Sequence, residues 1–545
     1  WGGMMKEKLA KLNQAAWKQH SVIKNLLTLI SLREPETVVT KKEGTALSND
    51  YEPSPTYSAA QKIGLVCGPL LFILLMFVLN LEGVSQEGRA VLATTAWMAA
   101  WWITEALPIP VTSLLPIILF PLTGAMELGV TASTYSSDII FLFLGGFFLA
   151  ISIEKWNLHR RIALSIIRMV GTSPERLVLG LVISTGFISM WISSTATTLM
   201  MVPIATAITL KFSEMVDKNG MYNQEAEDTK KKFGKVLMLT VSYASLTAGM
   251  ATLIGTPANA LFAGYVKEAY GIEISFAKWM LVGTPIAIIC TTLVYFMLVK
   301  VLFPLPIKEL PGGSEIIESE LKEMGPMTRE EKMVGTVFVL TALSWMTRSL
   351  VLQPFVSPFI DDAIIAMIAT FILFMLPSKQ SPGETLLTWS SASKLPWGIL
   401  ILFGGGLAIG AGFSKSGLTE WVGAQLVSLS TLPVLAIVFL IIFLVIFLSE
   451  VTSNTALATV LIPVMGSLAA AIGIDPLGLL LATTLAATTA FMLPTGTPPN
   501  AIVFSSGKLT IREMMRAGFL LNILCAIILT AFIYWYVPLV WGINL

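Results

Sequence analysis

Two short polar motifs, each present twice, carry the side chains of this sequence that could bind a ligand within apolar surroundings. The first copy is Ser193-Ser194-Thr195 followed by Gly255-Thr256-Pro257-Ala258-Asn259, and the second is Ser453-Asn454-Thr455 followed by Gly496-Thr497-Pro498-Pro499-Asn500. Each tripeptide lies between apolar runs, and each Gly-Thr-Pro-x-Asn motif interrupts what would otherwise be a membrane helix. We interpret the four stretches as one substrate site at mid-membrane depth.

The residue types of these motifs indicate which ligand they could bind. They offer hydroxyls, one amide at a tripeptide, free backbone N–H groups and free carbonyls. The N-termini of half-helices carry partial positive charge and suit anions, whereas unwound carbonyls and the C-termini of half-helices suit sodium. No Arg or Lys stands near the tripeptides in the sequence, and a cation as main substrate would require buried carboxylates. The motifs therefore favour a small anion held by dipoles and hydroxyls.

The duplication extends to the apolar segments around the motifs. The tripeptides are separated by 453 − 193 = 260 residues, and the same offset relates Gly145 to Gly405 and Pro203 to Pro463. The Gly-Thr-Pro motifs differ by 496 − 255 = 241 residues, because a polar loop at 211–235 in the first copy is replaced by a shorter stretch at 466–478 in the second. A constant offset over three features in the same order predicts an internal repeat.

Composition places the chain in a membrane. Of its 545 residues, 55% are hydrophobic and 13% are charged, with a mean hydropathy of +0.77, whereas soluble domains carry roughly 25% charged residues. No basic stripe suggests a nucleic-acid partner. The three cysteines lie in apolar runs without metal-ligand spacing, and both histidines lie in charged flanks, which argues against a zinc site or a His-based hydrolase. We predict an all-α membrane protein.

The hydropathy pattern predicts about eleven transmembrane helices and two re-entrant hairpins. The segments 175–210 and 433–471 are each too long for one straight span, so each is expected to fold back with its tripeptide at the tip. Amphipathic stretches at 155–171 and 418–429 predict surface helices. The expected spans are 63–81, 90–106, 108–122, 138–153, 236–270 with a break, 279–302, 334–352, 363–376, 397–413, 477–504 with a break and 517–541.

The distribution of lysine and arginine predicts a multi-pass protein of the plasma membrane with a cytoplasmic N-terminus. The two hairpins then enter from opposite sides, which gives an inverted-topology repeat, the build of a secondary transporter. Residues 1–61 are expected to form a polar tail, in which 15–32 is either a surface helix or plain tail. Residues 1–3, before Met4, are expected to be a remnant of cloning.

Two acidic residues lie within apolar stretches. Glu105 stands before a proline break near the predicted inner surface, and a structural role is favoured for it. Glu450 lies four residues before Asn454. Acids in membrane segments are functional candidates by default, and for Glu450 we favour an orienting hydrogen bond to the hairpin over proton transfer.

At these motifs the chain resembles the divalent anion/sodium symporter family of di- and tricarboxylate carriers, from about Lys62 to the C-terminus. The resemblance implies a homodimeric elevator transporter in the lipid bilayer, with no cofactor other than sodium. A scaffold would hold the dimer while a transport unit with both hairpins slides across the membrane. The implied segments are scaffold 62–171 and 331–430, transport 172–303 and 431–545, and a cytoplasmic connector at 304–330.

The resemblance also implies the roles of individual residues. Substrates of the family are succinate, malate, fumarate, 2-oxoglutarate or citrate, and the tips and loops grip their carboxylates. The implied substrate-binding residues are Ser194, Thr195, Thr256, Pro257, Asn454, Thr455, Thr497 and Pro498. The implied sodium sites are Ser189, Ser193, Ser194 and Gly255 for the first ion, and Ser449, Thr452, Asn454 and Gly496 for the second.

The sequence departs from the family pattern at two positions. Ser194 replaces the usual Asn of the first tip, and Thr452 stands where a small residue is common. An amide oxygen reaches further than a hydroxyl, so the first sodium site is expected to be weaker. Without sodium to neutralise the dianion, one-for-one exchange would balance the charge. We therefore place dicarboxylate exchange slightly ahead of sodium symport.

Two function classes other than a carrier remain as alternatives. An anion channel is less favoured because hairpins entering from both sides, together with broken helices, indicate alternating access. An intramembrane enzyme would need a nucleophile with a base, or a metal, and the sequence offers no paired His or Cys for either. The sequence does not choose among C4 and C5 dicarboxylates, citrate and sulfate.

Overall fold

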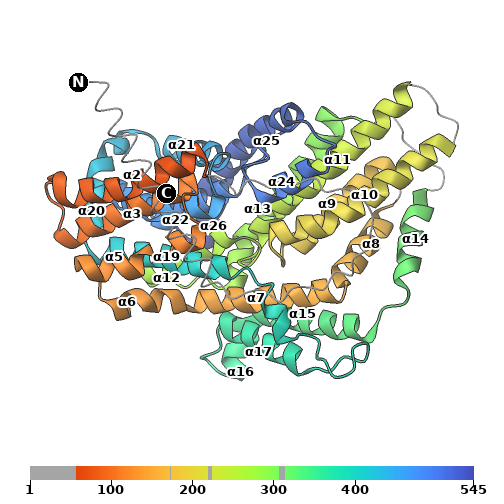
Figure 1. The fold of residues 1–545 in the computed structure, drawn as a ribbon, viewed down its shortest axis with the longest axis horizontal. Helices are drawn as coiled ribbons and strands as arrows, with labels where there is room; N and C mark the ends of the chain where they lie inside the picture. The colour runs from red at the N-terminus through yellow and green to blue at the C-terminus, as the bar shows by residue number, and fades with distance from the viewer. Residues whose placement is uncertain (1–56, 172, 219–223, 306–312) are drawn as a thin grey trace, which may run out of the picture. The chain divides into compact units, whose positions relative to one another are not determined.

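The computed structural model describes residues 57–171, 173–218, 224–305 and 313–545, and its named elements there are all helices (Figure 1). Extended backbone pairs at an isolated bridge between Pro377 and Thr385. The all-α fold is thus confirmed for the described part of the chain. The predicted tail lies outside the described residues up to residue 56, as does its candidate surface helix.

The helices of the first half begin and end at the following residues: α2 (Ala59–Ile73), η1 (Leu74–Val78), α3 (Gln86–Thr104), α4 (Ile109–Thr112), α5 (Leu115–Thr123), α6 (Leu128–Ser133), η2 (Thr134–Ser136), α7 (Asp138–Lys155), α8 (Leu158–Val170), α9 (Pro174–Ser189), α10 (Ser194–Lys218), α11 (Gln224–Ala248), η3 (Gly249–Ala251), α12 (Pro257–Tyr270), α13 (Phe276–Phe296), η4 (Met297–Leu302) and α14 (Gly313–Met324).

Those of the second half are α15 (Arg329–Thr347), η5 (Arg348–Leu352), α16 (Gln353–Phe355), α17 (Asp362–Met375), α18 (Trp389–Ala392), α19 (Trp397–Lys415), α20 (Leu418–Leu426), η6 (Val427–Thr431), α21 (Val434–Ser449), α22 (Asn454–Ile472), α23 (Pro476–Ala487), α24 (Pro498–Ser505), α25 (Ile511–Ala531), η7 (Phe532–Tyr536) and α26 (Val537–Trp541).

The number of membrane-spanning helices differs from the prediction. Within the described residues, eight helices are long and apolar enough to cross a membrane, or nine if the pair 418–431 and 434–449, bent by 116°, counts as one span. The predicted total of about eleven is therefore not confirmed. Three of the expected spans are shorter apolar helices, at Ile109–Thr123, Asp362–Met375 and Pro476–Ala487, because a proline or an unwound loop interrupts or ends each run.

The order of the elements and their backbone conformation agree with the predicted internal repeat. The first copy runs from α7 to α13 and the second from α19 to α25. Helices α8 and α20 each follow a residue in the left-handed conformation, Asn157 (φ 56°) and Gly417 (φ 72°), which are 417 − 157 = 260 residues apart. Thr256 and Thr497 cap α12 and α24 with dihedrals that agree within a few degrees (φ −146°, ψ 144° and φ −145°, ψ 149°).

Helices are interrupted at the positions predicted for the two hairpin tips and the two broken helices. Helices α9 and α10 are joined through 190–193, and α21 and α22 through 450–453, so each tip ends with the first residue of its tripeptide. The chain leaves helical structure between η3 and α12 and again between α23 and α24, at the Gly-Thr-Pro motifs. The sequence motifs therefore mark real interruptions of the helices.

The polar loop predicted at 211–235 is largely helical, which corrects the prediction. Helix α10 continues to Lys218 and α11 already starts at Gln224. Lys230 pairs with Asp217 on α10 and, at 2.6 Å, with Glu227 one turn earlier on α11. Such pairs support helix in water, so both helices extend beyond the apolar stretch.

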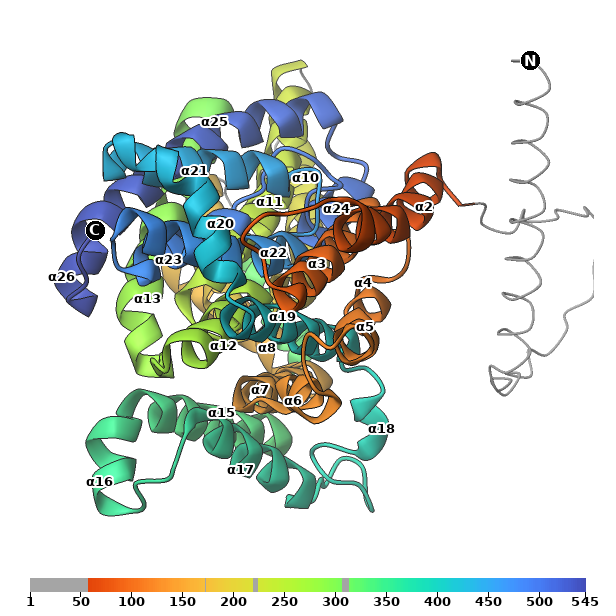
Figure 2. The ribbon, with the colours of Figure 1, turned by 90° about the vertical axis from the view of Figure 1, so that its left-hand side faces the viewer.

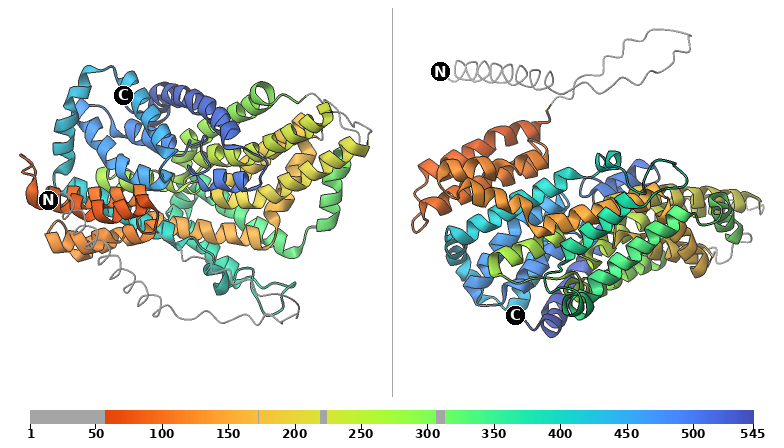
Figure 3. Two further views of the ribbon diagram at one scale, coloured as in Figure 1. Left: turned by 45° about the horizontal axis from the view of Figure 1, so that its top comes forward. Right: turned by 90° about the horizontal axis from the view of Figure 1, so that it is seen from below.

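Packing brings the two copies together. Helices α9, α10 and α11 run side by side (Figure 3, yellow to lime), and α11 also contacts α24 of the second copy. Helix α7 runs along α17 (Figure 1), and α15, α16 and α17 lie together at the lower edge of Figure 2. Helices α10 and α11 of the first copy are thus packed directly against α24, which follows the second unwound loop.

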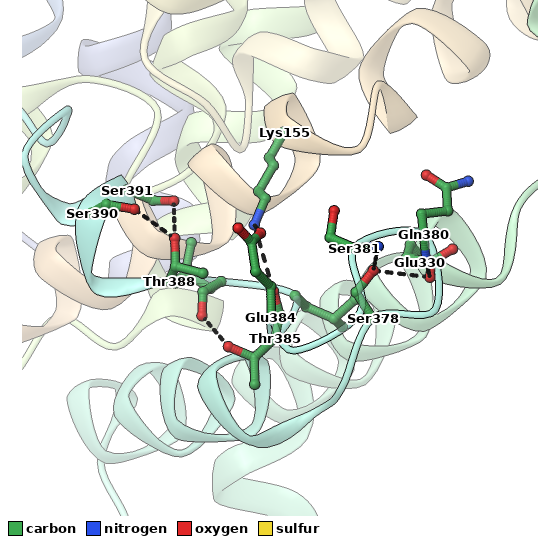
Figure 4. A network of polar contacts seen from close by, with 12 residues as sticks. Lys155, Glu330, Ser378, Gln380, Ser381, Glu384, Thr385, Thr388, Ser390 and Ser391 are labelled. Carbon is green, nitrogen blue, oxygen red and sulfur yellow. Dashed lines mark hydrogen bonds and ion pairs between the residues drawn. The ribbon is translucent and has the colours of Figure 1, made fainter.

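A polar network fixes the loop between α17 and α18 (Figure 4). Glu330, in the first turn of α15 and 1% exposed, accepts hydrogen bonds from the N–H groups of Lys379 (2.7 Å) and Gln380 (3.1 Å). Lys155, at the end of α7, pairs with Glu384 at 3.5 Å. This loop leads into the segment before α19, so the network also fixes the position of that segment.

Candidate functional site

A cavity of about 1150 Å³ lies where the two hairpin tips meet the two unwound loops. Its lining includes all eight predicted substrate-binding residues: Ser194, Thr195, Thr256, Pro257, Asn454, Thr455, Thr497 and Pro498. The cavity is larger than ordinary ligand pockets, which measure roughly 300–1,000 Å³, and it extends to Gln61 near the start of α2. The fold therefore assembles one site from both copies of the repeat.

Four helix N-termini meet in the lining of this cavity. Helix α10 begins at Ser194, α12 at Pro257, α22 at Asn454 and α24 at Pro498. The first turn of a helix leaves backbone N–H groups without intrahelical partners, and the helix dipole adds positive potential there. Four such ends, two from each copy, give the cavity the character of a site for an anion with two negative groups.

The Gly-Thr-Pro-x-Asn motif starts a helix through its threonine and proline. The Thr256 hydroxyl accepts a hydrogen bond from the N–H of Ala258, and the Thr497 hydroxyl accepts one from the N–H of Asn500, both at 3.3 Å. Proline suits the first helical position because it has no N–H to leave unpaired. The same two residue types therefore open α12 and α24.

The asparagine of the motif closes the unwound loop. The Asn259 amide donates to the carbonyls of Gly249 (3.1 Å) and Thr252 (2.8 Å). The Asn500 amide likewise donates to the carbonyls of residues 490 and 493, both at 3.0 Å. These carbonyls are 241 positions apart in the two copies, so the loops are folded by the same two bonds.

The first predicted sodium site is brought together in part. The hydroxyls of Ser189 and Ser194 both donate to the carbonyl of Ser245, at 2.6 and 2.9 Å. Gly255 packs against Gly249, whose position is also next to the Ser194 hydroxyl. Of the predicted ligands, Ser193 and Ser194 line the cavity, while Ser189 and Gly255 lie outside its lining.

In the second predicted sodium site, Thr452, Asn454 and Gly496 line the cavity and Ser449 is buried outside its lining. The amide oxygen of Asn454 is buried and has no hydrogen-bond partner among the described residues. A buried acceptor left unpaired is unfavourable. Oxygen atoms of this kind are the ligands that sodium takes at unwound helices, so the residues present fit a sodium ion.

Substituting Gly255 by alanine is expected to disrupt the first half of the site. A Cβ at position 255 would lie 2.3 Å from the Gly249 carbonyl oxygen, so the unwound loop would have to move. Overpacking of this kind costs about 1–3 kcal/mol, and both thermal stability in detergent and transport should fall. Gly129→Ala, where a Cβ meets nothing within 4 Å, is the control. Wild-type values for Gly255→Ala would contradict the close packing.

Glu450 orients the second unwound loop. Its carboxylate, 3% exposed, accepts hydrogen bonds from the N–H groups of Phe491 (2.8 Å), Met492 (2.9 Å) and Leu493 (3.0 Å) and from the side chain of Asn522 (2.7 Å). Four donors satisfy an ionised carboxylate. The predicted bond to the hairpin is corrected: Glu450 itself lies at the hairpin tip, and its partners lie in the unwound loop and α25.

Three charged residues line the cavity without having been assigned to it from the sequence. These are Glu105, Glu154 and Lys394. Packing brings Lys394 to the lining of the cavity from a segment that is distant in the sequence. Glu105 ends α3 in the left-handed conformation, and its carbonyl accepts a bond from Gln61 at 3.2 Å, which agrees with a structural role.

Comparison with known proteins identifies membrane transporters as relatives of this chain. Residues 61–542 match the family model described as the sodium:sulfate symporter transmembrane region. The sodium-dependent dicarboxylate transporters SdcS of Staphylococcus aureus strains bovine RF122 / ET3-1 and USA300 are each 44% identical over 512 residues, which cover 94% of this chain and 97% of the relative. The match therefore spans nearly the whole length of both proteins.

Two solved structures share the fold at low sequence identity. The YdaH transporter of Alcanivorax borkumensis has a TM-score of 0.52 at 14% identity, covering 76% of this chain and 88% of its own. MtrF of Neisseria gonorrhoeae has a TM-score of 0.51 at 13% identity, covering 87% and 94%. At such identity the likeness concerns the fold alone, whereas the family model and the curated relatives are transporters and not enzymes. The chain belongs to the divalent anion/sodium symporter family of membrane transporters.

Proposed function

We propose that this chain is a sodium-coupled symporter of small dicarboxylates such as succinate, malate, fumarate or 2-oxoglutarate. The observation that carries the proposal is one cavity lined by the first residues of four helices, among them Asn454, whose amide oxygen is buried and has no partner among the described residues. The 44% identical relatives named as sodium-dependent dicarboxylate transporters support the same substrate class.

Sodium symport takes precedence over the exchange that the sequence favoured slightly. The argument for exchange was the missing amide at Ser194. The hydroxyls of Ser189 and Ser194 nevertheless both donate to the Ser245 carbonyl. Three oxygen atoms therefore lie close together at the first predicted sodium site without that amide. The sodium dependence named for the relatives favours symport further. Exchange remains the second candidate because of the Ser194 substitution.

The arrangement of the tips explains how sodium would support anion binding. The first residues of α10 and α22 line the cavity, while α9 and α21 end at Ser189 and Ser449, which lie outside its lining. Helix C-termini carry partial negative charge and suit cations. Sodium at these ends would reduce the charge of the loaded site and order the tips, and Thr195 and Thr455 would then donate their hydroxyls to the two carboxylates.

We propose an elevator mechanism in a homodimer, with scaffold 62–171 and 331–430, transport unit 172–303 and 431–545, and a cytoplasmic connector. Two ion pairs join the proposed units, Lys267 with Asp138 and Arg348 with Glu273, the latter at 2.6 Å. These pairs would have to break when the transport unit moves. We place the protein in the plasma membrane with its N-terminus in the cytoplasm. The two repeats would then have opposite orientations in the membrane.

The test is uptake of labelled succinate into proteoliposomes that contain the purified protein and no internal dicarboxylate. We expect an inward sodium gradient to drive accumulation, and equimolar potassium to give only background, because sodium is needed to compensate the dianion. Vesicles loaded with unlabelled succinate are the control. Uptake that requires loading and ignores sodium would overturn symport in favour of exchange, and single-channel currents would indicate a channel.

A further inference from the structure

Helix α11 of the first copy is hydrogen-bonded to the unwound loop of the second copy. The Ser242 hydroxyl donates to the amide oxygen of Asn500 at 2.6 Å, and both side chains are fully buried. One residue further on, the Tyr243 hydroxyl donates to the carbonyl of Phe491 at 2.8 Å. The loop that carries Thr497 is therefore attached to a helix of the other repeat.

The orientation of the Asn500 amide follows from its other bonds. Its nitrogen donates to the carbonyls of Ala490 and Leu493, so its oxygen must face Ser242, and the serine hydroxyl must be the donor. A bond between two buried groups is strengthened by the low local dielectric, and losing one partner leaves the other unsatisfied. Ser242 thus has a defined and sensitive partner in the second loop.

The same turn of α11 is also hydrogen-bonded to residues of the first predicted sodium site. The Ser245 carbonyl accepts the hydroxyls of Ser189 and Ser194, and the Ser245 hydroxyl donates to the carbonyl of Ser242 at 2.8 Å. Ser242 then bonds Asn500, which holds the carbonyl of Leu493, and the N–H of Leu493 bonds Glu450 at the second tip. A continuous chain of hydrogen bonds therefore joins the two hairpin tips through α11.

This link is not a consequence of the repeat. The counterpart of Asn500 is Asn259 (500 − 259 = 241), and its amide oxygen, although buried, has no hydrogen-bond partner in the described part of the chain. The position that corresponds to Ser242 is Thr483 (483 − 242 = 241), whose hydroxyl donates to the Leu479 carbonyl of its own helix. In both copies an asparagine closes the unwound loop. Only the asparagine of the second copy, Asn500, also accepts a bond from a serine of the other copy among the described residues.

We propose that Ser242 is a positioning residue that couples the two halves of the transport cavity. An ion or carboxylate that draws Ser189 and Ser194 toward itself changes their bonds to Ser245, and the adjoining turn of α11 transmits the change to Asn500 and the second loop. Binding at one half then favours binding at the other, and such coupling is reciprocal. The inference rests on the proposed transport function.

Ser242→Ala tests the coupling in proteoliposomes. We expect the sodium concentration for half-maximal succinate uptake to rise about threefold to tenfold, as the loss of one hydrogen bond allows, and the Hill coefficient for sodium to fall toward one. Ser242→Thr restores a hydroxyl and should recover both values. Tyr243→Phe removes the neighbouring bond while keeping the ring, and should shift them in the same direction.

The control is Ser467→Ala, which removes a fully buried hydroxyl that donates to the Pro463 carbonyl of its own helix. It should leave the sodium curve unchanged. An unchanged curve for both Ser242→Ala and Tyr243→Phe, or an equal shift for Ser467→Ala, would overturn the coupling. If wild-type uptake ignores sodium, the proposed symport fails separately. The coupling is then tested by the succinate concentration that gives half-maximal uptake. A rise in Ser242→Ala but not in Ser467→Ala supports the coupling, and no rise in Ser242→Ala overturns it.

Discussion

Glu450→Ala is expected to reduce succinate uptake to background and to lower the thermal unfolding midpoint of the detergent-solubilised protein. The carboxylate is the acceptor for three consecutive N–H groups of the second loop and for the amide of Asn522. Each buried donor left unpaired costs about 1–3 kcal/mol. The loop that positions Thr497 and Pro498 would lose its main attachment to the hairpin, so binding and folding should fail together.

Two further variants separate the structural role of Glu450 from proton transfer. Glu450→Gln keeps one acceptor oxygen but turns an NH₂ group toward N–H donors, so we expect a severe loss of uptake and a smaller loss of stability. Glu420→Gln, on the exposed side of α20, should behave as wild type. Full uptake by Glu450→Gln with an altered pH profile would contradict the loop-orienting role and indicate that the acid transfers a proton.

The positions of the hairpin tips and broken helices could be predicted because the residue types at these positions are a local signal in the sequence. Gly, Thr and Pro in an apolar run disfavour a continuous helix whatever surrounds them, and the Asn of each motif stands at a fixed distance from the carbonyls that it holds. The constant offset between the copies showed that the two tips are equivalent positions of a repeat, and we therefore predicted that they form one site. The eight residues predicted to hold the substrate line one cavity for this reason.

Contacts between distant segments could not be predicted in the same way. The partners of Glu450 lie 41 to 72 positions further on, and Lys394 reaches the cavity only through the packing of the segment before α19. Helix ends were missed where charge prolongs a helix into water, as Lys230 does with Asp217. Hydropathy measures how much of a helix is apolar, not where the helix stops, and this also explains why the predicted number of spans differs from the number of long apolar helices.

Asn454→Ala is expected to abolish sodium-dependent uptake without a loss of stability in the sodium-free protein. Its amide oxygen is buried and unpartnered among the described residues, so the protein without ligand already bears the desolvation cost of that oxygen. Removing the group should leave the unfolding midpoint unchanged or slightly higher. The effect on stability is therefore opposite in sign to that of Glu450→Ala, although both variants should fail in transport.

The measurement is thermal unfolding with and without sodium and succinate. A ligand present at 100 times its Kd stabilises the folded state by about 2.7 kcal/mol, so wild-type protein should show a clear rise in the unfolding midpoint. Asn454→Ala should show none, because the oxygen that would bind sodium is gone. Asn544→Ala, at an exposed position near the C-terminus, should keep the wild-type rise. A full sodium-induced rise in Asn454→Ala would show that this oxygen is not a ligand, and the second sodium site would then have to be built from Ser449, Thr452 and Gly496 alone.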